Sequence, residues 1–240
     1  MDKLIYTVMT GAERALHAQQ VHANNLANAD TNGFRRDYEA SRTQSVEGYG
    51  YDTRLQSVGV SDVVSQRMGA VRETGRDLDI AIMGEGFVAV ADGNGEAYTR
   101  AGAMLVDGQG NLSINGHPVL GDGGPITLPP FSQVSIASDG TVSIVPRNGT
   151  DFQQVDRLKL VSGDQAMAKN SAGLLVVREG GELEPSDDVR IRSGALESSN
   201  VSPVEEMVAV MDISRQFEIQ MKLYQAADSM ADAGNRLMRD

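Results

Sequence analysis

The feature that most constrains this chain is the helix-termination signal in residues 24–35, which closes a helical segment at the start of the chain. Apolar and small residues recur before that stop in steps of three and four, which is typical of one face of an α-helix. Asn32-Gly33 tolerates the left-handed conformation that a helix C-cap often needs. Phe34 can fold back on the last turn, and Arg35 and Arg36 would lie near the negative helix end. The sequence therefore predicts an N-terminal helix that ends near residue 30.

The apolar face of this first helix resembles a heptad seam made largely of small side chains. Small residues would allow a partner helix to approach closely, but they bury little area each. An isolated helix of this kind is marginal in water, so we expect it to need a neighbour. The seam consists of Ile5, Met9, Ala12, Leu16, Ala23 and Leu26.

A second helix is predicted at the other end of the chain, starting at the capping box Ser202-Pro203-Val204-Glu205. In such a box the serine oxygen accepts from a free backbone N–H, and proline suits the first helical position. No proline follows. Apolar residues then recur along one broad stripe, so we expect this helix to pair with the first as a coiled-coil-like segment. The stripe comprises Val204, Met207, Val208, Met211, Phe217, Met221, Tyr224, Ala227, Ala231 and Leu237.

Between the two ends the pattern changes to short β-like runs separated by turn sequences such as Asp139-Gly140. The predicted fold class is α+β: terminal helices that pair with each other, a central all-β domain and an extended connector. The expected domains are residues 1–36 (helix and cap), 37–70 (connector), 71–198 (β-rich) and 199–240 (C-terminal helix). The connector contains Tyr38, Tyr49 and Tyr51 and lacks a sustained period.

Composition excludes several classes of function. A net charge of −12 disfavours general nucleic-acid binding, and the absence of cysteine excludes disulfides and thiolate metal sites. The apolar run at residues 4–9 is too short for the core of a Sec signal peptide and follows no basic segment. No stretch is long enough to span a bilayer, so we expect neither a membrane span nor a cleaved Sec signal.

Motifs that resemble catalytic, cofactor or metal sites have simpler explanations. The Asp/Asn/Gly runs at 92–95 and 107–111 lack EF-hand spacing and are expected to be hairpin turns. Gly84-Glu85-Gly86 is half of a dinucleotide fingerprint and is expected to be a bend. The three histidines have no ligand spacing, and no nucleophile elbow, Walker loop or acid/base pair is present. We therefore expect no catalytic residue, no cofactor and no metal.

Three separated blocks of sequence resemble the axial proteins of the bacterial flagellum, the family of rod, hook and hook-associated proteins. The first block is Asn24-Asn25-Leu26-Ala27-Asn28 followed by Thr31-x-Gly33-Phe34-Arg35, and residues 1–12 are similar to the start of proximal rod proteins. The second block covers residues 75–82, 84–87, 98–102 and 107–112. The third covers residues 194–201, Glu206-Met207-Val208 and Arg215-Gln216-Phe217-Glu218. The resemblance spans nearly the whole chain.

The resemblance implies a structural subunit of the flagellar basal-body rod, exported by the flagellar type III apparatus without a cleaved signal. Its partners would be copies of itself and other rod proteins, in the hollow rod that crosses the periplasm. Another axial paralogue, a monomeric binding module closed by a terminal coiled coil, and a cell-wall glycan hydrolase remain as alternatives. The residues expected to mediate assembly are the seam residues named above together with Asn24, Asn25, Asn28, Thr31, Gly33, Phe34, Asn200, Val201, Glu206, Met207, Val208, Met211, Arg215, Phe217, Glu218, Met221 and Tyr224.

Overall fold

The computed structural model describes residues 2–45, 55–93, 95–163 and 166–237. The chain divides into two compact units. One unit, the terminal-helix unit, contains residues 1–27, 37–63 and 202–240. The other, the β-rich unit, contains residues 28–36 and 64–201.

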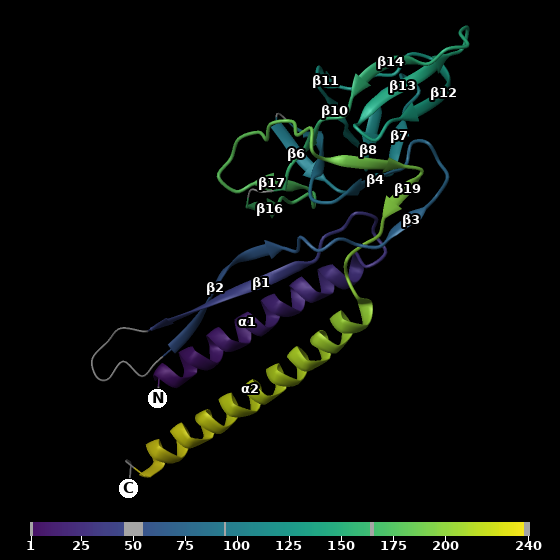
Figure 1. The fold of residues 1–240 in the computed structure, drawn as a ribbon. Coiled ribbons are helices and arrows are strands. Elements are labelled where there is room, and N and C mark those ends of the chain that lie inside the picture. Colours follow the sequence, from purple (N-terminus) through teal and green to yellow (C-terminus); the bar gives the residue numbers. More distant parts are fainter. Residues whose placement is uncertain (1, 46–54, 94, 164–165, 238–240) are drawn as a thin grey trace. The chain divides into compact units, whose positions relative to one another are not determined.

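Two long helices dominate the terminal-helix unit, α1 (Asp2–Ala27) and α2 (Pro203–Leu237). They contact each other and run in opposite directions (Figure 1). Helix α2 begins at Pro203, as the capping box predicts, and the Glu206 N–H donates to the Ser202 carbonyl oxygen at 3.1 Å. Helix α1 ends at Ala27, six residues before Gly33, so this glycine is not its C-cap.

The predicted coiled-coil-like pairing of these helices is wrong. A coiled coil buries its apolar seam, yet Met9 and Leu16 are each about half exposed, and Met211 is 65% exposed. Among the described side chains of the helices, the buried ones are instead Ala15 and two polar residues, Asn25 and Glu206. The fold is therefore a mainly β chain with two terminal helices, of which α2 leaves most of its described large apolar side chains exposed.

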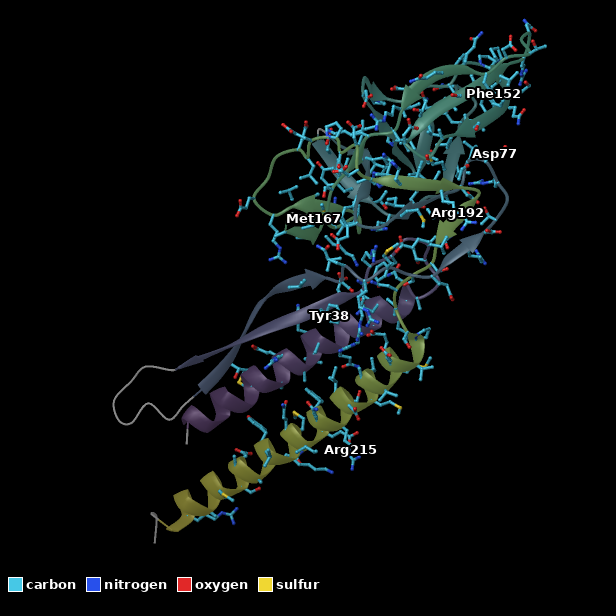
Figure 2. All side chains as sticks on the ribbon, viewed as in Figure 1. Tyr38, Asp77, Phe152, Met167, Arg192 and Arg215 are labelled. Atoms are coloured by element: carbon cyan, nitrogen blue, oxygen red, sulfur yellow. The ribbon has the colours of Figure 1, made fainter. Side chains whose placement is uncertain are left out.

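The predicted connector, residues 37–70, is also corrected. Strands β1 (Asp37–Ser45) and β2 (Leu55–Val64) pair in a two-stranded sheet (Figure 1). Backbone hydrogen bonds hold such a pair together, and the polar sequence of β1 gives no sustained alternation that would indicate it. Tyr38 follows the start of β1 and is partly exposed (Figure 2). Tyr49 and Tyr51 lie outside the described residues.

The β-rich unit is built from small sheets around one main apolar core. The largest has the strand order β15-β5-β6-β17-β16, and a three-stranded antiparallel sheet has the order β12-β13-β14. A second three-stranded sheet has the order β7-β8-β9, and the pairs are β18-β4, β19-β3 and β10-β11. The strands are β3 (Val71–Glu73), β4 (Ile80–Met83), β5 (Phe87–Asp92), β6 (Gly95–Thr99), β7 (Met104–Val106), β8 (Leu112–Ile114), β9 (His117–Pro118), β10 (Leu120–Gly121), β11 (Gly124–Pro125), β12 (Phe131–Ile136), β13 (Thr141–Pro146), β14 (Gln153–Arg157), β15 (Leu160–Val161), β16 (Met167–Lys169), β17 (Leu175–Val177), β18 (Arg190–Ser193) and β19 (Ala195–Glu197).

The turn sequences of this unit form hairpins. Asp107 stands between β7 and β8, where its carboxylate accepts from the Gln109 and Asn111 backbone N–H groups at 2.8 Å each. Asn111 Nδ2 also donates to Asp107 Oδ2 at 2.8 Å, and this side-chain bond, together with the two backbone bonds, stabilises the charged form and lowers the pKa of the Asp107 carboxyl group. The runs at 92–95 and 107–111 therefore connect paired strands, β5 to β6 and β7 to β8.

Candidate assembly site

A polar cluster joins the two helices and the first strand within the terminal-helix unit. Glu206 of α2 is completely buried, and its Oε2 lies 2.5 Å from His22 Nδ1 and 3.5 Å from Asn25 Nδ2 of α1. Asn25, also buried, exchanges two hydrogen bonds with the Asp37 backbone: its Nδ2 donates to the carbonyl oxygen at 3.0 Å, and its Oδ1 accepts from the N–H at 2.9 Å. We call these four residues the helix-end cluster. Buried polar groups of this kind fix how elements pair, because a shifted register would leave them unsatisfied.

A second cluster, in the β-rich unit, surrounds the buried carboxylate of Glu197, which is 1% exposed. Arg100 Nε donates to Oε2 at 2.8 Å, and Arg35 Nη2 lies 3.1 Å from Oε1. The Gly69 N–H also donates to Oε1, at 2.9 Å. We call Arg35, Arg100 and Glu197 the Glu197 cluster. Two cations and several donors around one carboxylate make it a strongly bound anion in an apolar setting.

The other donors of Arg100 hold the bend between β4 and β5. Its Nη2 donates to the carbonyl oxygens of Ile82 (3.0 Å) and Gly84 (2.8 Å), and its Nη1 donates to that of Gly86 (3.1 Å). The predicted bend at residues 84–86 is thus fastened from inside. Burial lowers the pKa of both guanidinium groups, to about 10 for Arg35, where the charge of Arg100 adds to the effect and Glu197 opposes it.

Residues 33–36 are tied to residues 197–200 by backbone and side-chain bonds, all within the β-rich unit. The Gly33 N–H donates to the Glu197 carbonyl oxygen at 2.8 Å, and the Asn200 N–H donates to the Phe34 carbonyl oxygen at 3.3 Å. The Arg36 N–H donates to Asn200 Oδ1 at 2.7 Å. We call this set of contacts the terminal bridge, because it joins the chain just after α1 to the chain just before α2.

Gly33 has a different role from the predicted helix cap. Its φ is +72°, and a Cβ added there would lie 2.2 Å from the backbone nitrogen of Ala101. The position therefore needs glycine both for its conformation and for the close approach of residues 100–101. A glycine required by long-range packing cannot be told from a capping glycine by local sequence.

Phe34 and Arg35 likewise contact distant residues of the β-rich unit, to which they belong. The Lys169 ammonium lies 3.6 Å from the centroid of the Phe34 ring, a cation–π geometry, and donates to the Arg35 carbonyl oxygen at 2.6 Å. The prediction that Arg35 serves the negative end of the first helix is wrong, because its guanidinium lies within the Glu197 cluster.

The predicted assembly residues fall into three groups. Asn25, Val201 and Glu206 are buried, and the side chain of Ile5 lies outside the described part. The half-buried group is Ala12, Leu26, Asn28, Gly33, Phe34, Asn200 and Phe217. The exposed group is Met9, Leu16, Ala23, Asn24, Thr31, Met207, Val208, Met211, Arg215, Glu218, Met221 and Tyr224, with Arg215 visible on α2 in Figure 2.

Sequence reasoning did not select His22, Asp37, Arg100 or Glu197. His22 was considered only as a metal ligand, and Arg100 and Glu197 only as parts of resembling blocks. His22 and Glu206 are 184 residues apart and Arg100 and Glu197 are 97 residues apart along the chain, separations that no local pattern reveals. Among the described residues, no group of three or more His, Asp or Glu side chains is arranged to hold a metal. No helix in that same part of the chain has the length and apolarity of a membrane span.

Three family descriptions match successive parts of the chain. "Flagella basal body rod protein" matches residues 5–35, which include most of α1 and residues 33–35 of the terminal bridge. "Flagellar hook protein FlgE/F/G D1 domain" matches residues 81–144. "Flagellar basal body rod FlgEFG protein C-terminal" matches residues 192–237, which include Glu197, Asn200 and α2.

Full-length relatives have the same order of parts. The chain is 39% identical to the flagellar basal-body rod protein FlgF of Escherichia coli, over 99% of both chains. It is 38% identical to FlgF of Salmonella typhimurium, again over 99% of both. Identity is lower, 29%, to the rod protein FlgG of Bacillus subtilis, over 96% of this chain and 97% of that protein. The chain therefore belongs to the FlgF family of flagellar basal-body rod proteins.

Proposed function

We propose that this chain is a structural subunit of the flagellar basal-body rod and that it polymerises through α1 and α2. Its family consists of structural, non-enzymatic proteins. Copies of itself and other rod and hook components would be its neighbours. We further propose that it reaches the periplasm through the flagellar type III apparatus, as the family resemblance implies.

The observation that carries this proposal is the open apolar face of α2. Val204, Met211 and Met230 are 69%, 65% and 70% exposed, and Met207, Val208, Ile219 and Leu223 are each about half exposed. Exposed apolar area of this extent marks an interaction surface. Burying it against another protein is favourable by about 25 cal/mol of free energy per Å². Equivalent helices of neighbouring subunits would cover it through heterologous contacts, which generate a helical assembly.

Folding and assembly would then be coupled. Ordering a residue costs about 1–2 kcal/mol of backbone entropy, and the contacts between α1 and α2 leave most apolar groups of α2 in water. We infer that residues 1–27 and 203–237 are loosely held in the free subunit and become firmly helical in the rod. The assembly residues named above would act at that stage.

A pair of aspartate substitutions on α2 tests the proposal in cells. Met207→Asp and Met211→Asp together place two charges on the open face, and burying them against a neighbour would be costly. We expect loss of the variant from purified basal bodies and loss of swarming, with normal protein levels. Met83→Asp is the matched control, an exposed methionine of the β-rich unit, and it should assemble. Normal incorporation of the α2 variant would contradict the proposal.

A further inference from the structure

We propose that Glu197 and Asn200 are positioning residues for rod assembly: through the terminal bridge they keep the exit of α1 and the entry of α2 together while both helices are unfolded. This inference rests on the proposed coupling of helix folding to assembly. It divides the N-terminal segment between residues 27 and 28. Residues 33–36 then belong to the preformed β-rich unit, and only residues 1–27 become firmly helical on contact with neighbouring subunits.

The bridge is fastened by contacts that do not involve either helix. Gly33 donates to the Glu197 carbonyl oxygen, and a side chain at this glycine would overlap the backbone of residues 100–101. Arg35 is 3% exposed and pairs with Glu197, and its Nη1 donates to the carbonyl oxygens of Gln66 and Arg67. Unfolding of α1 breaks none of these bonds.

The C-terminal half of the bridge is anchored in the same way. Asn200 Nδ2 donates to the Arg67 carbonyl oxygen at 2.7 Å, while Oδ1 accepts from the Arg36 N–H. The Ser198 N–H donates to the Ala70 carbonyl oxygen at 2.8 Å, and strand β19 pairs with β3. Asn200 lies three residues before α2, so the chain that leads into α2 is held to the β-rich unit whether or not the helix is folded.

The consequence is a high local concentration of one terminal segment for the other. Arg36 and Asn200 are 164 residues apart in the chain, yet a hydrogen bond of the bridge joins them directly. Short flexible linkers between two binding segments give effective concentrations on the order of millimolar. A subunit whose helices are unfolded would therefore present both segments together to the growing rod, and a subunit without the bridge would present them separately.

Hydrogen exchange followed by NMR in the full-length monomer tests this directly, across a series of urea concentrations below the unfolding of the β-rich unit. We expect the amides of Gly33, Arg36 and Asn200 to lose protection together with core amides such as that of Ile144. Amides of α1 and α2 should open at lower urea, with protection at least about tenfold weaker. Loss of protection at Gly33, Arg36 and Asn200 together with the helices would overturn the inference.

The same data separate the inference from the proposed function. If the helical amides are as well protected as the core without urea, folding is not coupled to assembly, and the proposed mechanism fails. If, in that case, the bridge amides still open with the core at higher urea, the bridge is part of the preformed β-rich unit as inferred, and only its action on unfolded helices is refuted.

Asn200→Ala supplies the functional readout, because it removes the side-chain bonds of the bridge and leaves the Glu197 cluster intact. We expect an unchanged urea midpoint for the β-rich unit and at least about threefold slower incorporation into basal bodies. Asn111→Ala is the matched control: it removes side-chain bonds to Asp107 and Thr127 near the turn between β7 and β8, where the described residues make no bond to the bridge residues, and should incorporate normally. Equal incorporation of both variants would contradict the positioning role.

Discussion

The two units of this protein treat apolar side chains in opposite ways. In the β-rich unit Ile80, Met104 and Leu112 are fully buried, while in the terminal-helix unit Met211 and Met230 are mostly exposed. Burial of large side chains is the main favourable term in folding, so the first unit has its own source of stability. The second unit leaves large apolar side chains in water, and contact with further protein surface would bury them. The difference separates a unit with a buried apolar core from one that exposes most apolar side chains of α2, which we propose to be the assembly interface.

The polar residues separate the units as well. The β-rich unit buries an Arg–Glu–Arg network, whereas the terminal-helix unit has the helix-end cluster where a coiled coil would have leucine. Polar contacts specify a pairing more than they stabilise it. The helices therefore have a defined register and little net stability of their own.

The largest effect should come from removing the carboxylate of the Glu197 cluster. Glu197→Ala leaves two guanidinium groups buried without their anion, and breaking a buried pair in this way costs about 3–5 kcal/mol. Urea unfolding of the β-rich unit measures it. The exposed Glu184→Ala serves as control and should lie within about 0.5 kcal/mol of the parent. A small effect of Glu197→Ala would show that this unit does not depend on its buried network.

Truncation of apolar side chains should separate the two units most clearly. Ile144→Ala creates a cavity in the core and should lower the free energy of unfolding by about 2–5 kcal/mol. Met211→Ala removes a similar side chain from α2 and should change it by less than about 0.5 kcal/mol in the monomer. Equal losses at the two positions would contradict the contrast between the units.

Gly33→Ala tests the close approach at the terminal bridge against a matched glycine. Both Gly33 (φ +72°) and Gly173 (φ +77°) have left-handed backbones, but a Cβ at Gly173 meets no atom within 4 Å. Each alanine variant should lose about 1 kcal/mol to backbone strain. Gly33→Ala should lose a further 1–3 kcal/mol or so because residues 100–101 must move. The midpoints of thermal unfolding compare the stability of the two variants. Equal midpoints would contradict the close packing of Gly33 against residues 100–101.

The smallest effect concerns Tyr98, which is buried on β6 and accepts a hydrogen bond from the Leu183 N–H at 2.7 Å. Burial raises the pKa of its hydroxyl group from 10 to about 12. Between pH 10 and pH 12 the unfolded chain loses this proton and the folded chain keeps it, so stability should fall as pH rises through that window. Ultraviolet titration should show one late phenolate that Tyr98→Phe removes. A titration curve unchanged by this substitution would contradict the burial of the Tyr98 hydroxyl group.

The sequence was sufficient where structure follows from local chemistry. The Asp-Gly and Asn-Gly turns led to hairpins such as β12–β13 around Asp139-Gly140, and proline within a capping box led to the start of α2. Turn and cap residues act through their own backbone and near neighbours, which a sequence displays directly. The end of α1 was placed three residues late because Gly33 resembles a cap.

The rest depended on contacts between distant parts of the chain. Arg35, Arg100 and Glu197 are single charged residues in three unrelated stretches, and nothing in any stretch indicates burial. The pairing of β1 with β2 joins a mostly polar strand to one of mixed sequence, and neither shows a sustained alternation of apolar and polar residues. The apolar stripe of α2 was recognised, but periodicity alone cannot tell a face covered within the subunit from one left open for a neighbour.

Limited proteolysis of the monomer with mass analysis of the resistant fragment tests the central claim, that the terminal helices gain their stability from neighbours. The account predicts rapid cleavage within residues 2–27 and 203–237. It also predicts a resistant fragment that retains Gly33 to Asn200 and contains little helix by circular dichroism. Full-length protein that resists the protease and keeps its helical signal in dilute solution would contradict it.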